Sequence, residues 1–388
     1  MTQETEGPLS GLTVVAVEQA VAAPFCTGRL ADAGATVLKI ERPEGDFARG
    51  YDTAAKGQAS YFVWLNRGKK SVVLDLASEE GRRDLHTLIA DADILVQNLK
   101  PGAMERLGFG TEALRKEFSA LIVCSISGYG DTGPYADRKA YDLLIQAESG
   151  LASVTGAPSA PGRVGISIVD VATGATAHAA ILEAVLQRYR TGRGADIRIS
   201  MFDVIAEWLA VPLLNAEAGS PPKRLGLAHP SIAPYGAYRC SDGKEVVISI
   251  QNEREWKRLC EEVLGDASLA QDERFRNNVA RVANRPALNA IIDGVFGART
   301  RDQVTAMLAK AKVAFGALNS VEDLTHHVQL RRVTVETPAG PISMPAPPVI
   351  QTDGAVPRGP IAGINPGRVP RTGEHTEALR AEFAPGKA

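Results

Sequence analysis

The stretch LTVVAVEQAVAAPFCTGRLADAGATVLKIERP, residues 12–43, predicts a complete strand–helix–strand unit. Residues 12–18 are a near-continuous apolar run, typical of a parallel strand that is buried on both faces. Residues 25–35 are predicted as a helix that ends at Gly34, and residues 36–43 as a second strand that stops at Pro43. The unit therefore points to a parallel α/β sheet.

The same alternation continues along the first two hundred residues. Strand-like runs occupy residues 70–76, 93–98 and 120–128, and helices are predicted over 78–91 and 111–117. This order predicts an α/β fold with a Rossmann-like, doubly wound parallel sheet. The first strand–helix turn lacks the pattern G-x-G-x-x-G, so only topology would support NAD binding.

The character of the sequence changes near residue 219. Before it, a helix over 171–190 is followed by one more strand and one long apolar helix. After it come a Pro/Gly-rich linker, a hairpin around Asp242-Gly243 and further helical patterns. We predict a large domain over residues 1–218, completed by the C-terminal segment 333–388, and a linker with a small α+β domain over 219–332.

The composition reduces the number of functional classes to which the protein can belong. The chain has 388 residues, a net charge of −2, 45% hydrophobic and 23% charged residues, which argues against nucleic-acid or anionic-membrane partners. The polar, acidic start suggests no signal peptide, and no apolar run reaches the roughly 18 residues that span a bilayer. The four cysteines form no CxxC pair and the six histidines show no metal-ligand spacing, which predicts a reduced, cytoplasmic protein without a metal site.

Asp170 stands where the apolar run ISIV meets the sequence VATGATAHAA, which is rich in Ala, Thr and Gly. As an N-cap, Asp170 would only accept hydrogen bonds from the first N–H groups of a helix. The small residues after it would let another backbone or a ligand come close, and Gly174 costs a helix up to about 1 kcal/mol relative to Ala. An ionised, accessible aspartate among backbone donors that can hold an oxyanion would instead suit a carboxylate nucleophile. Both interpretations stay open.

Basic residues follow two of the predicted strands. Arg42 comes directly after one strand, and Lys100 and Arg106 lie in a turn after another. Because the carboxyl ends of parallel strands share one edge, these cations are expected to line one crevice. They would bind a phosphorylated ligand or form a solvated basic rim. Lys69 and Lys70 lie at the start of a strand and are weaker candidates.

Several blocks together make the chain resemble the family III CoA-transferases. They are VAAPFCTGRLADAGATVLKIERPEGD, NRGKKSVVLDL, DILVQNLKPGAMERLG, SISGYGDTGP, YDLLIQAESGL, TGRG and GEHT, and they cover most of residues 9–210 and 373–376. The resemblance implies a Rossmann-like large domain, a small domain and a homodimer of two interlocked chains. It implies acyl-CoA and a free carboxylic acid as substrates, with no permanently bound cofactor.

The resemblance also implies the site. Asp170 would be the nucleophile that carries CoA as an aspartyl-CoA thioester. The residues that match the family's CoA contacts are Arg42, Leu74, Asp75, Ala77, Asn98, Leu99, Lys100, Arg106 and Lys139.

An alternative within the same fold is an α-methylacyl-CoA racemase, which uses a histidine in a GHD motif as a base. The matching segment here is AYD, so Tyr141 replaces the histidine, and an unperturbed tyrosine with a pKa near ~10 is a poor base at pH 7. Tyr141 thus favours the transferase, where it is expected to orient the substrate. Asp142 would orient groups near Asp170, bind substrate, or be a polar residue of a first helical turn.

The substrate is less well defined. Val21 stands where formyl-CoA transferase has a glutamine, and the glycine-rich loop that covers its active site is not visible in 225–245, where only PYGAY (234–238) is found. Formyl-CoA and oxalate are therefore not the expected substrates. We expect a short dicarboxylic pair, such as succinyl-CoA with a methyl-branched C4–C5 acid, whose distal carboxylate Arg or His side chains of the small domain would bind. Transfer within one molecule, and a protein that binds acyl-CoA without turnover, remain alternatives.

Overall fold

The computed structural model describes residues 7–350 and 367–382. Contacts between Cα atoms divide the chain into two compact units. The first contains residues 1–151, 163–211 and 331–388, and the second contains 152–162 and 212–330. Residues 152–162 and 212–218, which the prediction placed in the large domain, thus lie in the second unit, and residues 331–332, predicted in the small domain, lie in the first.

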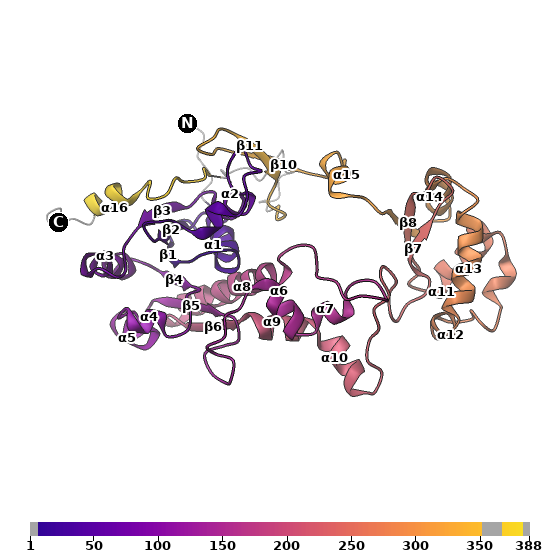
Figure 1. Cartoon of the computed structure of the whole chain (residues 1–388), viewed down its shortest axis with the longest axis horizontal. Coiled ribbons are helices and arrows are strands. Elements are labelled where there is room, and N and C mark those ends of the chain that lie inside the picture. Colours follow the sequence, from indigo (N-terminus) through magenta and orange to yellow (C-terminus); the bar gives the residue numbers. More distant parts are fainter. Residues whose placement is uncertain (1–6, 351–366, 383–388) are drawn as a thin grey trace. The chain divides into compact units, whose positions relative to one another are not determined.

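The first unit is built on a six-stranded sheet in which every neighbouring pair is parallel. The strand order is β3-β2-β1-β4-β5-β6, the doubly wound order of Rossmann-like folds (Figure 1). All strands of the N-terminal half predicted from the sequence are present. Their bounds are β1 Thr13–Val17, β2 Thr36–Glu41, β3 Lys70–Val73, β4 Ile94–Gln97, β5 Ile122–Ser127 and β6 Asp196–Ser200.

The sheet is buried on both faces, which explains why β1 has no polar residue after Thr13. Successive side chains of a strand point to opposite faces. Val14 and Ala16 join one apolar cluster together with residues of α1 (Ala22–Asp32) and α8 (Ile168–Thr191). Val15 and Val17 join another cluster, with residues of α3 (Glu79–Ala90) and α5 (Thr111–Glu117).

Two predicted helix boundaries are wrong by three residues. α1 begins at Ala22 rather than residue 25, because Pro24 lies in the first turn, where a helix tolerates a missing N–H. α8 begins at Ile168 rather than 171. The long apolar helix expected after β6 is two helices, α9 (Met201–Trp208) and α10 (Ala210–Glu217). Short helices not predicted are α2 Ser60–Asn66, α4 Ala103–Arg106, α6 Asp142–Glu148, α7 Leu151–Val154 and the 3-10 turn Phe47–Gly50.

The C-terminal segment packs on the first unit. Its hairpin, β10 (Arg332–Val335) and β11 (Ile342–Pro345), shares an apolar cluster with Phe62 and Val63 of α2. Ser71 of β3 exchanges hydrogen bonds with residues 373 and 375, and α16 (Thr376–Glu382) lies beside β3 (Figure 1). The rest of the predicted tail, residues 351–366 and 383–388, lies outside the described residues.

The second unit has its own antiparallel sheet, in the order β7-β8-β9. β7 (Tyr235–Arg239) and β8 (Glu245–Ser249) form the hairpin predicted around Asp242-Gly243, and β9 (Ala314–Ala317) pairs with β8. Trp256, Phe275 and Phe296 are fully buried in the core of this unit. Its helices are α11 Glu253–Arg258, a π-helical turn Leu259–Leu264, α12 Asn278–Ala283, α13 Arg285–Phe296, α14 Arg301–Lys310 and α15 Val321–Thr325.

α8 is long and apolar enough to cross a membrane by length and composition alone, with a mean hydropathy of 1.3. It is the one such helix within residues 7–350 and 367–382. In the structure it packs against α1 and the sheet, and Val169, Ala177 and Ile181 are fully buried there. α8 is therefore the core helix of this unit.

The four cysteines are buried free thiols.

Candidate active site

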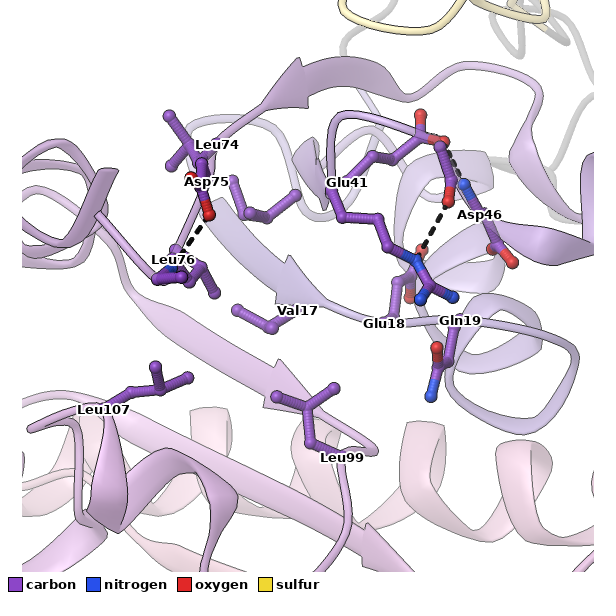
Figure 2. A pocket seen from close by; sticks show the side chains of 14 residues that line it. Val17, Glu18, Gln19, Glu41, Asp46, Leu74, Asp75, Leu76, Leu99 and Leu107 are labelled. Carbon is purple, nitrogen blue, oxygen red and sulfur yellow. Dashed lines mark hydrogen bonds between the residues drawn. The ribbon is translucent and has the colours of Figure 1, made fainter. Parts of the chain in front are cut away.

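A cleft of about 310 Å³ lies at the carboxyl ends of the central strands (Figure 2). Its walls come from the residues that end or directly follow β1, β2, β3 and β4, where ligands of open α/β sheets bind. The wall is mainly aliphatic, and its polar groups include Glu41, Asp46 and Asp75 (Figure 2). Apolar walls with a few polar groups are typical of sites for small organic ligands. The aliphatic lining residues are Val17, Ile40, Leu74, Leu76, Leu99 and Leu107.

The cleft brings together part of the predicted CoA site. Arg42, Leu74, Asp75, Ala77 and Leu99 all line it. The Nε–H of Arg42 donates to the carbonyl of Gly45 at 3.3 Å, and the Asp75 carboxylate accepts the Ala77 N–H at 3.0 Å. The exposed Arg42 guanidinium is the cation that these walls present to a ligand.

The other predicted contacts do not line this cleft. Asn98 instead bonds the backbone of Gln19: its Oδ1 accepts the Gln19 N–H at 3.0 Å and its Nδ2 donates to the Gln19 carbonyl at 2.9 Å. The Nζ of Lys100 lies 3.3 Å from the Oδ1 of Asp137. Arg106 and Lys139 are both exposed and do not line the cleft. The expectation that Arg42, Lys100 and Arg106 line one crevice is therefore wrong for this cleft.

Asp170 is not the N-cap of α8. The helix begins at Ile168, so Ser167 is the capping position and Asp170 is the third helical residue. The capping carboxylate comes from Asp142 of α6, whose Oδ2 accepts the N–H of Val169 at 2.8 Å and of Asp170 at 3.3 Å. The N–H groups of Val169 and Asp170 thus already have an acceptor. The expectation that N–H groups at this helix start could stabilise an oxyanion is wrong for these two.

Asp142 is itself held rigidly. Its other oxygen, Oδ1, accepts the side-chain N–H of Gln146 at 2.6 Å, and the side-chain oxygen Oε1 of Gln146 accepts the Val164 N–H at 2.9 Å. Asp142 is buried, so its carboxylate is committed to these protein donors. Of the roles left open for Asp142, the geometry favours orientation of the segment that carries Asp170.

The environment of Asp170 makes it a weak acid. The side chain of Asp170 is half-buried. The loss of solvation and the negative charge of Asp142 together raise the pKa of Asp170 to about 7. The carboxylate is therefore only partly ionised at neutral pH, which corrects the expectation of a fully ionised group. A pKa in this range is typical of functional carboxyl groups.

The small residues after Asp170 serve helix packing. A Cβ atom at Gly174 would lie 2.4 Å from the carbonyl oxygen of Ala22 and 3.0 Å from Cβ of Phe25. α1 thus crosses α8 at backbone contact distance, and the approaching group is another backbone rather than a ligand. This packing sets the position of the first turn of α8.

Replacement of Gly174 by Val is expected to lower the free energy of unfolding by about 1–3 kcal/mol, because the new side chain meets the α1 backbone and overpacks the core. Thermal and denaturant unfolding measure the change. Gly294→Val is the matched control, since nothing lies within 4 Å of a Cβ there in α13, and the same change in helix propensity from Gly to Val applies. Equal losses in both variants would contradict the close crossing.

Three tyrosines surround the start of α8: Tyr141, a predicted site residue, and Tyr51 and Tyr61, which the sequence did not point to. The Tyr61 hydroxyl lies 2.9 Å from the Ser167 hydroxyl, and the rings of Tyr51 and Tyr61 are 6.0 Å apart. Burial and the nearby charges of Asp46 and Asp170 raise the pKa of Tyr51 to about 12. Tyr141 is 60% exposed. Tyr61 and Ser167 are 106 positions apart, so no local pattern could have linked them.

A buried charge cluster, which we define as Glu18, Lys39, Asp46 and Lys69, adjoins the cleft, and Glu18 and Asp46 form part of the cleft wall. Lys39 contacts Asp46 at 2.8 Å and Glu18 at 3.5 Å, and Lys69 contacts Glu18 at 2.7 Å. All four side chains are buried, so the two ammonium groups and two carboxylates compensate one another. Burial lowers the pKa of Lys69 to about 8. Because Lys69 is buried against Glu18, it is excluded as a ligand for a phosphate group in the cleft. Lys70, in contrast, is exposed to solvent.

Comparison with known proteins places the whole chain in one family. Residues 9–376 match the model of CoA-transferase family III. The succinate–glutarate CoA-transferase of Agrobacterium fabrum is 35% identical, with 97% of this chain and 96% of that protein covered. The acetyl-CoA:oxalate CoA-transferase of Acetobacter aceti is 37% identical, with both chains covered completely at 100%.

The fold agrees with this placement. A CAIB/BAIF family protein from Brucella suis, known as a crystal structure, superposes with a TM-score of 0.81 at 38% identity and covers 97% of this chain and 100% of its own. The matched residues include the cleft, Asp142 and Asp170. The chain belongs to CoA-transferase family III and is a CoA-transferase.

Proposed function

We propose that the protein moves CoA from an acyl-CoA to a free carboxylic acid through a covalent aspartyl-CoA on Asp170. The observation that carries the proposal is the placement of Asp170: its backbone is fixed by Asp142 and its half-buried side chain has a pKa raised to about 7. A carboxylate of raised pKa is more basic and less solvated than an ordinary one, and is therefore a stronger nucleophile once deprotonated.

The proposed reaction alternates anhydrides and thioesters. An Asp170 oxygen attacks the thioester carbonyl, the C–S bond breaks, and CoA leaves as a thiolate from a mixed anhydride. The thiolate then attacks the aspartyl carbonyl and releases the donor acid as a carboxylate, which leaves aspartyl-CoA. The acceptor carboxylate attacks this thioester, and the expelled thiolate takes the acyl group from the new anhydride. No proton or electron is gained or lost overall.

We propose that Arg42, Leu74, Asp75, Ala77 and Leu99 of the cleft hold CoA. The aliphatic wall suits the adenine and pantetheine parts of CoA, and the Arg42 guanidinium suits its phosphates. Asn98, Lys100, Arg106 and Lys139 remain proposed contacts by resemblance alone.

We propose short dicarboxylates as the acids, with succinyl-CoA as donor and a C4–C5 acid as acceptor. Support comes from the relative named for succinate and glutarate, whereas the relative named for acetyl-CoA and oxalate supports only the class of dicarboxylic acids. Tyr141 in place of the racemase histidine supports transfer over proton exchange.

We also propose that the chain works as the interlocked homodimer that the family resemblance implies. The support is the apolar surface around α10, where the large side chains Trp208, Val211, Leu213 and Leu214 are all more than half exposed, at 58%, 66%, 53% and 63%. Light scattering coupled to gel filtration is expected to give twice the chain mass.

Trapping tests the proposed function. Incubation with succinyl-CoA followed by hydroxylamine is expected to convert Asp170 to its hydroxamate, which peptide mass spectrometry locates. Borohydride is expected to reduce the same thioester to an alcohol. Binding of the acyl-CoA with no modified aspartate would contradict the covalent route and favour a protein that only binds acyl-CoA.

Arg42→Ala is expected to raise KM for acyl-CoA about tenfold with kcat within about twofold, because a charged hydrogen bond to phosphate is lost while the reacting groups are untouched. Arg83→Ala in α3 is the control, since Arg83 is exposed and does not line the cleft. Steady-state kinetics with varied succinyl-CoA measure both constants. A loss confined to kcat would contradict a phosphate contact.

The pH dependence follows from the pKa of Asp170. Only the deprotonated carboxylate is a nucleophile, so kcat/KM is expected to rise with pH up to about 7 and to level off above it. Asp142→Asn keeps an oxygen that can accept the Val169 N–H but removes the repelling charge, so it is expected to move this limb to lower pH. Glu148→Gln, which removes an exposed charge from the same helix, is expected to leave the profile unchanged. A profile that is the same in all three proteins would contradict the electrostatic coupling.

A further inference from the structure

The turn Gln19–Val21 connects the cleft with the surroundings of Asp170. Gln19 lines the cleft. Val21 belongs to an apolar cluster against which Ala20, Tyr61 and Val171 pack, and Val171 is the residue next to Asp170. A change in the conformation of this turn therefore alters both the cleft wall at Gln19 and the packing at the start of α8.

The backbone of the turn has an unfavourable conformation. Ala20 has φ of 63°, in the left-handed region that residues other than glycine rarely adopt. Two side chains hold it there. Asn98 bonds both backbone groups of Gln19, and the Asp46 Oδ1 accepts the Ala20 N–H at 3.2 Å. Such strain persists where the surroundings impose it, and it is common at functional sites.

Asp46 is fully committed to the protein. Its Oδ1 also accepts the Ala48 N–H at 2.9 Å, and its Oδ2 accepts from Lys39 at 2.8 Å. Lys39 is completely buried, and Phe62 lies on it with the ring centre 5.9 Å from Nζ. Burying this ion pair carries a cost in desolvation, so the pair calls for a role beyond stability, and the bond from the Ala20 N–H to Asp46 supplies one.

We propose that Asp46, anchored by Lys39, is a positioning residue for CoA transfer: it keeps Ala20 in its left-handed conformation and so fixes the turn that lies between the cleft and the start of α8. This inference rests on the proposed function. Asp46 itself touches no reacting atom, because both of its oxygens are bonded to protein donors. It acts through the backbone of Ala20.

Two double variants separate positioning from folding. Lys39→Met/Asp46→Asn and Lys39→Met/Asp46→Ala both remove the charge pair, so neither leaves a buried ion without its partner. Only the Asn variant keeps an oxygen that can accept the Ala20 N–H. The Ala variant is expected to have a kcat about 100-fold below the Asn variant, with KM for succinyl-CoA little changed, because misplacement of reacting groups slows the chemical step. Amide hydrogen exchange at Ala20 is expected to be faster in the Ala variant.

Ala20→Gly, added to the Ala variant, supplies a residue that adopts positive φ readily and is expected to restore about tenfold in kcat. Asp32→Asn is the control for buried ion pairs, since Asp32 pairs with Arg67 at the other end of α1; it is expected to lower the melting temperature and leave kcat unchanged.

Equal kcat in the two double variants, with a wild type that is active, would overturn the proposal, and so would unchanged exchange at Ala20. A wild type that neither transfers CoA nor forms an adduct at Asp170 would overturn the proposed function instead, and the exchange rate at Ala20 would still decide whether Asp46 holds the turn.

Discussion

Asp170→Asn is expected to lower kcat for CoA transfer at least about 10⁴-fold and to abolish the trapped adduct, because an amide cannot form the anhydride or the aspartyl thioester. Binding of acyl-CoA is expected to change little, since Asn has the same shape and the bond from the Asp170 N–H to Asp142 comes from the backbone. Calorimetry measures the binding, and mass spectrometry measures the adduct.

Asp203→Asn is the matched control. Asp203 is also the third residue of a helix, α9, but it is exposed on another element. It is expected to keep wild-type activity. If Asp170→Asn retained transfer, or if folding and CoA binding were lost together, Asp170 would have a structural role only.

Lys39→Met is expected to lower the free energy of unfolding by about 3–5 kcal/mol, the second largest effect. The substitution leaves Asp46 buried without a cation, while Glu18 keeps Lys69. Although burial alone favours the neutral amine, Glu18 and Asp46 outweigh it and raise the pKa of Lys39, so the pair is ionised in the folded protein.

Urea unfolding followed by circular dichroism measures the loss for Lys39→Met. Lys70→Met, an exposed lysine that pairs in register with Leu38 across β2 and β3, is the control and is expected to change stability by less than about 0.5 kcal/mol. A similarly small effect of Lys39→Met would mean that water reaches the cluster. Addition of Asp46→Asn is expected to recover part of the stability, because it removes the unpaired charge.

The strands could be predicted because their evidence is local. Apolar runs such as residues 12–18 must be buried on both faces, and only a sheet covered by helices does this for several strands in succession. The helix start at Ala22 was missed because Pro24 looks like a break. The start at Ile168 was missed because residues 166–169 form an apolar run, whereas the capping group of α8 is Asp142, 27 positions before Val169.

The features of the candidate site also fall into those that the sequence predicts and those that only the structure shows. The sequence by itself determined the parallel sheet and the family resemblance, and through the resemblance it led to Asp170 as the proposed nucleophile, since each depends on residue types in order along the chain. Only the tertiary structure decided that Asp142 holds the start of α8, that Gly174 makes room for α1, that Lys69 is buried against Glu18, and that Asp46 reaches Ala20. These are contacts between distant segments, and burial and charge compensation depend on what surrounds a residue in space, which the order of neighbours along the chain does not specify.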